Sequence, residues 1–135
     1  MYKKLFIILG LSCIITCILA ACGAGTSSTN TTGTTTTAGT EVHMNSTNFV
    51  QTSITIKKGQ SVTLVDDDAL TPHIIANGTW ENGTAKPAKE PNAPEVKNVQ
   101  INGNASAAIG PFTSAGTFKL YCTIHSGMNL TVVVQ

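Results

Sequence analysis

Apolar and polar residues alternate along much of the chain beyond residue 40, and this pattern predicts short β-strands. Apolar side chains occupy every second position in the segments 54–56 and 62–64, which flank the pair Lys58-Gly59. A two-residue period is typical of a strand with one buried face, and Gly permits a tight turn. We therefore predict a β-hairpin across Lys58-Gly59.

The same alternation recurs in three later segments, at residues 99–101, 118–122 and 130–134. Glycine-rich turns separate these segments, and no stretch shows a convincing helical period. Several short strands without helices favour a β-sandwich or a small barrel. The pattern therefore predicts one all-β domain over residues 41–135.

Three features of this domain are expected to lie at its surface. The segment 77–97, which contains Trp80, is rich in Pro, Gly and Asn, so we expect a long surface excursion instead of a strand. The acidic run Asp66-Asp67-Asp68 is expected to form a solvated turn. His43 is expected to be an ordinary surface histidine.

The N-terminal segment has the features of an export signal. Lys3 and Lys4 precede an apolar run over residues 5–19, which is too short for a comfortable membrane span. The run ends in Leu19-Ala20-Ala21-Cys22, which resembles the lipobox of bacterial lipoproteins. This resemblance implies that residues 1–21 are a lipoprotein signal peptide and that Cys22 is the acylated first residue of the mature protein.

Residues 22–40 are expected to form a flexible tether between the lipid anchor and the domain. After Cys22 the segment consists of Gly, Ala, Thr, Ser and Asn, which cannot nucleate a core. A random coil of this length spans roughly 20–25 Å on average. We therefore expect the protein on the extracytoplasmic face of a bacterial cell membrane, either periplasmic or at the cell surface.

The charge of the chain argues against nucleic acid as a partner. The eight cations are all Lys, the acids number seven, and the formal net charge is +1. No basic stripe is available to neutralise phosphates.

Cysteine usage points to a metal. Cys13 and Cys17 fall within the signal segment and Cys22 within the lipobox, which leaves Cys122 as the one thiol of the folded domain. An unpaired thiol in an oxidising compartment is a liability unless something occupies it, and a metal is the usual occupant.

The segment CTIHSGM, residues 122–128, supplies further metal ligands. Cys122 is expected to end one strand, His125 to lie on the loop that follows, and Met128 to precede the last strand. His73, after Pro72 at the end of the predicted hairpin strand, can supply a second imidazole. Two His and one Cys with a weak axial Met are the ligand set of blue-copper electron-transfer sites.

Two longer segments resemble the cupredoxins, in particular the plastocyanin and amicyanin type of small blue copper protein. They are KKGQSVTLVDDDALTPHII and GPFTSAGTFKLYCTIHSGMNLTVVV. The resemblance implies a Greek-key β-sandwich and one copper ion held by His73, Cys122, His125 and Met128. It further implies a monomeric one-electron carrier that is not an enzyme and that docks transient redox partners near His125.

The chain departs from the family pattern beside the expected ligands. Many family members have Asn after the first His and Pro in the copper loop, whereas this chain has Ile74, Ile124 and Ser126. The Asn side chain usually helps to join the two copper-bearing loops. The resemblance therefore implies an intact ligand set with different tuning by its neighbours.

Two other functions use the same residues. A copper-delivery or copper-storage lipoprotein also needs soft ligands, but it favours metal exchange over redox chemistry. An enzyme with a Cys-His nucleophile and base is a weaker alternative, because it gives no role to Met128 or His73.

Overall fold

The structure is a computed structural model that describes residues 40–135. The described residues form nine strands: β1 (Thr40–Met44), β2 (Ser53–Ile56), β3 (Val62–Asp66), β4 (His73–Glu81), β5 (Thr84–Pro87), β6 (Val99–Ile101), β7 (Ser106–Ile109), β8 (Gly116–Cys122) and β9 (Asn129–Val134). Within this range no helix is long and apolar enough to cross a membrane. The expected signal peptide, Cys22 and nearly all of the expected tether lie outside the described residues. Strand β1 begins at the last residue of that tether.

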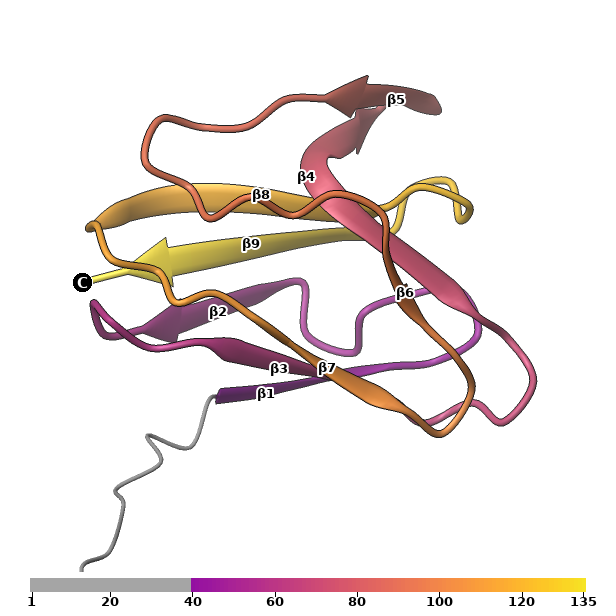
Figure 1. Cartoon of the computed structure of the whole chain (residues 1–135). Helices are drawn as coiled ribbons and strands as arrows, with labels where there is room; N and C mark the ends of the chain where they lie inside the picture. Colours follow the sequence, from indigo (N-terminus) through magenta and orange to yellow (C-terminus); the bar gives the residue numbers. More distant parts are fainter. Residues whose placement is uncertain (1–39) are drawn as a thin grey trace, which may run out of the picture. The chain divides into compact units, whose positions relative to one another are not determined.

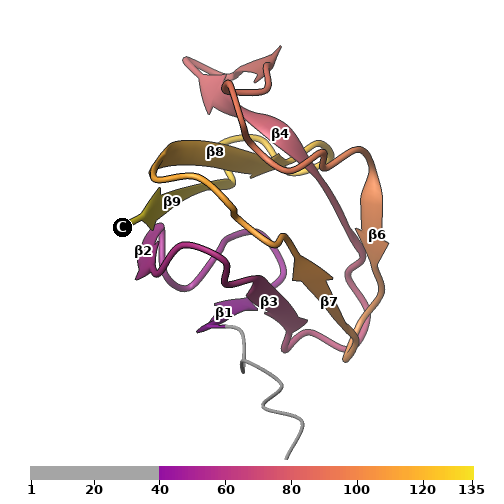
Figure 2. The same cartoon turned by 60° about the vertical axis from the view of Figure 1, so that its left-hand side comes forward.

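Two sheets face each other, as Figures 1 and 2 show. Their buried apolar side chains form one core cluster. The smaller sheet has the order β1-β3-β7, and the larger has the order β2-β9-β8-β4-β5, with β6 paired to β4. The predicted all-β sandwich is therefore confirmed.

Strands β2 and β3 do not form the predicted hairpin. The Lys58-Gly59 turn is present, and Gly59 adopts a left-handed φ of 89°. However, β2 pairs in parallel with β9 and β3 pairs in parallel with β1, so the two strands belong to different sheets. The alternation of apolar residues reports one buried face and carries no information about which strand lies alongside.

The two-residue period places one apolar side of each strand in the core. Two residues of each sheet illustrate this: the side chains of Val62 and Leu64 (β3), Leu120 (β8) and Val132 (β9) are fully buried and belong to one core cluster. On β8 the same alternation directs Cys122 inward. The alternation that directs apolar side chains into the core therefore also directs the Cys122 thiol there.

The segment 77–97 is a surface excursion only in its second half. Its first half completes β4 and forms a hairpin with β5, with Glu81 paired to Thr84. Asn82 and Gly83 both have positive φ, 49° and 74°, as a two-residue hairpin turn of type I′ requires. We did not predict this hairpin, because the abundance of Pro, Gly and Asn in the whole segment obscured the local Asn-Gly turn signal.

The irregular second half of the segment is fastened to β4 through Asn77. The Val96 amide donates to Asn77 Oδ1 at 2.7 Å, and the Asn77 amide donates to the Val96 carbonyl at 3.0 Å. Ala93 and Val96 of this segment are buried and belong to the apolar core cluster. The second half of the segment is therefore anchored both to β4 and to the core.

The close approach of β4 to β5 can be tested by a substitution at Gly78 of β4. A Cβ there would clash with the Lys86 carbonyl and with Pro87, and φ is 131°. We expect Gly78→Ala to lower the free energy of unfolding by about 3 kcal/mol, because backbone strain and overpacking add. Gly83→Ala is the control, since its φ is also positive but its Cβ meets open space. It should cost about 1 kcal/mol. Equal losses in urea denaturation would contradict the crowding at Gly78.

Candidate metal centre

The turn between β8 and β9 folds the segment 122–128 back on itself. The Cys122 amide donates to the Met128 carbonyl at 3.0 Å, and the Met128 amide donates to the His125 carbonyl at 3.2 Å. Gly127 adopts a φ of 83°, which permits the tight path between them. As predicted, Cys122 ends β8, His125 lies on the loop that follows, and Met128 directly precedes β9.

His73 reaches the site from β4, the strand next to β8. The prediction placed it at the end of the preceding strand, whereas it is the first residue of β4. Ile75 lies opposite Cys122 in the antiparallel β4–β8 ladder, and the Thr123 amide donates to the Ile74 carbonyl at 2.8 Å. This register brings His73 beside the cysteine, although 48 residues separate them in the chain.

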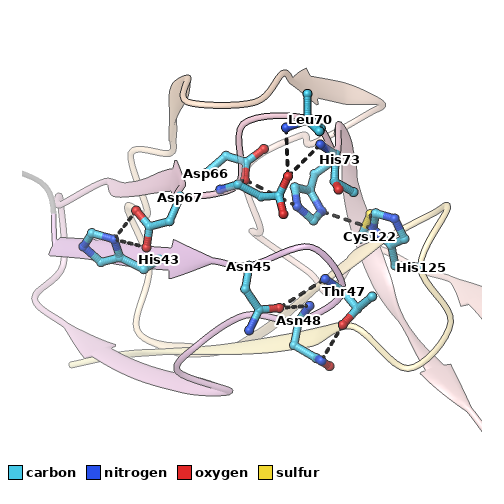
Figure 3. A network of polar contacts seen from close by, with 12 residues as sticks. His43, Asn45, Thr47, Asn48, Asp66, Asp67, Leu70, His73, Cys122 and His125 are labelled. Carbon is cyan, nitrogen blue, oxygen red and sulfur yellow. Dashed lines mark hydrogen bonds and ion pairs between the residues drawn. The ribbon is translucent and has the colours of Figure 1, made fainter.

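Three ligand atoms converge at this point, as Figure 3 shows. The Nδ1 atoms of His73 and His125 lie 3.2 Å apart, and Cys122 Sγ lies 3.4 Å from His125 Nδ1. All three lie within 4.8 Å of one another. His73 and Cys122 are 0% exposed, whereas His125 is partly exposed.

The spacing of these atoms fits a single metal ion. With metal–nitrogen bonds of about 2.0 Å, a metal–sulfur bond of about 2.3 Å and angles of about 120°, the nitrogens lie about 3.5 Å apart and nitrogen and sulfur about 3.7 Å apart. The observed separations of 3.2 and 3.4 Å are close to these values. Two imidazole nitrogens and a thiolate are also ligands that copper accepts.

Burial keeps His73 in the neutral form that a metal needs. Loss of solvent lowers the pKa of His73 from its ordinary value of 6.5; the Asp66 carboxylate opposes this shift and His125 adds to it. Because the pKa of His73 is lower in the folded than in the unfolded chain, protonation of this histidine favours unfolding. The free energy of unfolding is therefore highest above about pH 6.5 and decreases as the pH falls toward the folded-state pKa of His73.

Met128 lies at the end of the loop and is 1% exposed. Its backbone closes the loop through the bonds to His125 and Cys122 described above. Its thioether belongs to the same buried cluster of apolar residues as Cys122. A soft, polarizable donor is therefore held in the core beside the loop that carries the other ligands.

The acidic run does not form the uniformly solvated turn that we expected. Asp67 is exposed, but Asp66 is 2% exposed, and its Oδ1 lies 3.7 Å from His73 Nε2. Asp66 Oδ2 and His73 Nε2 are buried without a hydrogen-bond partner, and each such atom costs about 1–3 kcal/mol. Asp66 continues the inward alternation of Val62 and Leu64, a signal that the prediction did not use.

His43 lies at the surface, as predicted, and makes its contacts away from the three ligands. Its Nδ1 is 2.9 Å from Asp67 Oδ2, and this hydrogen bond raises the pKa of His43. Protonated His43 therefore stabilises the fold through Asp67. This stabilisation is fully present below the unfolded-state pKa of about 6.5 and is lost as the pH rises through the higher folded-state pKa.

Trp80 supports the backbone of the site, a role that the sequence did not reveal. Its Nε1 donates to the Cys122 carbonyl at 2.7 Å, and its ring packs edge-on against Tyr121 at a centroid distance of 6.0 Å. Asn129 accepts from the Trp80 amide and donates to its carbonyl. The β4–β5 hairpin thus fastens the end of β8 and the start of β9.

The fold and the site together define a small β-sandwich protein with a His₂Cys metal centre, of which His73 and Cys122 are buried and His125 is partly exposed. Residues 36–135 match the model of the family described as copper binding proteins, plastocyanin/azurin family. The chain belongs to this family, and its cofactor is one copper ion, with which the cluster of His73, Cys122 and His125 is consistent.

Solved structures of amicyanin share the fold. Amicyanin from Paracoccus versutus (Thiobacillus versutus) is 22% identical, with 73% of this chain and 82% of that chain covered and a TM-score of 0.54. A reduced Cu(I) form of an amicyanin mutant at pH 4 is 20% identical, with coverages of 73% and 83% and a TM-score of 0.55. No curated protein matches the sequence significantly.

The hydrogen bond from Trp80 to the Cys122 carbonyl can be tested by Trp80→Phe. Removal of the indole N–H leaves a buried carbonyl unpaired, so we expect a loss of about 1–3 kcal/mol in the free energy of unfolding. Tyr121→Phe, which keeps the ring contact, should lose at most about 0.5 kcal/mol. Denaturant titration of both variants measures the difference, and equal stabilities would contradict this role of Trp80.

Proposed function

We propose that the protein transfers single electrons through a type 1 copper centre held by His73, Cys122 and His125, with Met128 as the weak axial ligand. The observation that carries this proposal is the convergence of two imidazole nitrogens and one sulfur within 4.8 Å in a member of a copper-binding family. Copper bound there supplies a one-electron Cu(I)/Cu(II) couple.

Each ligand has a distinct part in this proposal. Cys122 would provide the strongly donating thiolate, and His73 and His125 would add two imidazole nitrogens. Met128 would tune the relative affinity for the two oxidation states as a weaker thioether donor. The β4–β8 ladder and the backbone hydrogen bond from Cys122 to Met128 hold these residues in place. Little movement of the chain is therefore expected to accompany a change of oxidation state.

The exposed side of the site suits brief contact with a redox partner. His125 is partly exposed, while His73 and Cys122 are fully buried. Ile124, next to His125, is 48% exposed, so an apolar side chain borders the imidazole edge. We propose that electrons leave through His125 to a transiently docked partner, as a small apolar contact permits.

The burial of the ligands disfavours copper delivery and a nucleophilic enzyme. Rapid delivery of copper needs ligands that a recipient can reach, and His73 and Cys122 are 0% exposed. A nucleophilic enzyme needs substrate access to the sulfur. A surface groove of about 420 Å³ is lined in part by Tyr121, which points to the opposite face of β8 from Cys122, and by Thr123, which follows the strand.

We further propose that the protein is a lipoprotein anchored through Cys22 to the extracytoplasmic face of a bacterial membrane. The support is the order of basic residues, apolar run and Leu19-Ala20-Ala21-Cys22 in the sequence. A Thr-rich tether would let the domain move between membrane-bound partners.

Visible absorption tests the copper centre directly. The copper-loaded wild type should show an intense thiolate-to-copper band, and Cys122→Ser should lose it because a hydroxyl oxygen is a poor soft donor. Circular dichroism of the variant checks that the sheets remain. Colourless Cu(I) binding by the wild type would favour copper delivery, and turnover sensitive to alkylation would favour an enzyme. A band that survives Cys122→Ser would contradict the assignment of Cys122 as a copper ligand.

The axial role of Met128 is tested by the reduction potential. Met128→Leu removes the thioether and should raise the potential, whereas Met128→Gln offers a harder oxygen and should lower it. A tenfold change in relative affinity for Cu(II) over Cu(I) equals about 59 mV, and shifts of this order are expected. Met44→Leu is the control, since Met44 is an equally buried core methionine. If voltammetry gives the wild-type potential for both Met128 variants, Met128 is not the axial ligand.

The lipid anchor is tested by Cys22→Ala in the full-length chain. This variant should move from the membrane fraction to the soluble fraction while its visible spectrum stays unchanged, because the anchor lies outside the domain. Cys13→Ala removes a thiol within the signal segment and should leave membrane attachment intact. Membrane association that survives the loss of Cys22 would point to another anchor.

A further inference from the structure

The outer nitrogen of His73 faces a buried carboxylate. Asp66 Oδ1 lies 3.7 Å from His73 Nε2, and both side chains are 0% exposed. In Figure 3 the His73 ring lies between Asp66 on one side and His125 with Cys122 on the other. One potential donor, Nε2, and one acceptor, Asp66 Oδ2, are both left without a partner here.

The fold holds the Asp66 carboxyl group in this place. Asp66 ends β3 on the inward side of the strand, and its amide donates to the Ala105 carbonyl at 2.9 Å. Its Oδ1 accepts from the Asp68 amide at 3.0 Å, which orients the carboxyl group toward His73. A side chain fixed by both its strand and its turn can orient a neighbour in return.

Binding of copper through Nδ1 determines where His73 carries its proton. A neutral imidazole has one N–H, so a ring that binds metal through Nδ1 must be protonated at Nε2. Metal-bound histidines almost always donate this second N–H to a carboxylate, a backbone carbonyl or water. Since His73 is fully buried, bulk water does not reach this N–H, and the protein groups around the ring are the candidate acceptors.

We propose that Asp66 is a positioning residue of the copper site: its carboxylate accepts the Nε2–H of His73, keeps Nδ1 free for copper and lowers the reduction potential. This inference rests on the proposed copper centre. A negative charge next to a ligand makes the imidazole a stronger donor and favours Cu(II) over Cu(I). The consequence is a lower potential than the four ligands alone would set.

The backbone carbonyl of Asn45 is the competing acceptor, because it also lies near the His73 ring. A carbonyl would fix the same tautomer but would add no net charge. The two acceptors therefore differ in their effect on the potential. Substitution of Asp66 separates them.

The experiment compares Asp66→Asn with Asp67→Asn in the full-length, copper-loaded chain. Both variants remove one negative charge from the same turn, but Asp67 is exposed and contacts His43. In the Asp66→Asn variant the amide oxygen of the new side chain can still accept from the Asp68 amide, so the turn is preserved. We measure the visible band, the affinities for Cu(I) and Cu(II), the potential, and the ¹⁵N and ¹H resonances of His73 in the diamagnetic Cu(I) form.

The proposal predicts three results. Asp66→Asn should keep the visible band but lose about tenfold to a hundredfold in Cu(II) affinity. A tenfold loss at constant Cu(I) affinity raises the potential by about 59 mV. The Nε2–H resonance, slow to exchange and shifted downfield in the wild type, should move upfield in this variant. Asp67→Asn should leave all three properties at their wild-type values.

Other outcomes overturn the proposal in distinguishable ways. A wild type without the intense band overturns the copper centre and this inference together. A coloured wild type whose potential and Nε2–H resonance respond equally to both substitutions overturns the role of Asp66 alone. If Asp66→Asn does not fold, an NMR experiment on the wild type decides between the two acceptors. A correlation across the hydrogen bond from the His73 Nε2–H to a labelled Asp66 carboxyl carbon would support the proposal. A correlation to the Asn45 carbonyl carbon overturns the proposal.

Discussion

The register of the β4–β8 ladder is the constraint on which the metal centre depends. Ile75 lies opposite Cys122, so His73 at the start of β4 falls beside the end of β8. A shift by one residue would turn the imidazole or the thiol to the other face of the sheet. The Thr123–Ile74 hydrogen bond and the Trp80 bond to the Cys122 carbonyl both oppose such a shift.

The centre is part of the hydrophobic core and not an addition to its surface. Cys122 belongs to the same buried cluster as Leu120 and Leu130, and Met128 closes the loop above it. The interactions that stabilise the sandwich therefore also position the ligand atoms. This coupling explains why two imidazole nitrogens and a thiol can approach one another closely in a site with little access to water.

The sequence was sufficient to single out the candidate ligands, because their spacing and their place at strand ends are local properties. It was less informative about pairing: alternation in residues 54–56 and 62–64 indicated strands, but their partners β9 and β1 are not the neighbours that the turn suggested. The burial of Asp66 was missed because its two acidic neighbours suggested solvent. Its period-two relation to Leu64, and the Asn82-Gly83 turn, were signals that the sequence did contain.

The two ends of the described chain are fastened to one turn. The Thr40 amide donates to the Ser61 carbonyl, and the Lys58 amide donates to the Gln135 carbonyl. From there β1 and β3 run in parallel toward the copper end, a rise of about 13 Å over four residue steps. Figure 1 shows the start of β1 and the C-terminus at the same end of the sandwich. A fusion partner or an electrode linker joined directly before Thr40 or after Gln135 would therefore leave His125 unobstructed, but the copper site would face away from the conducting support.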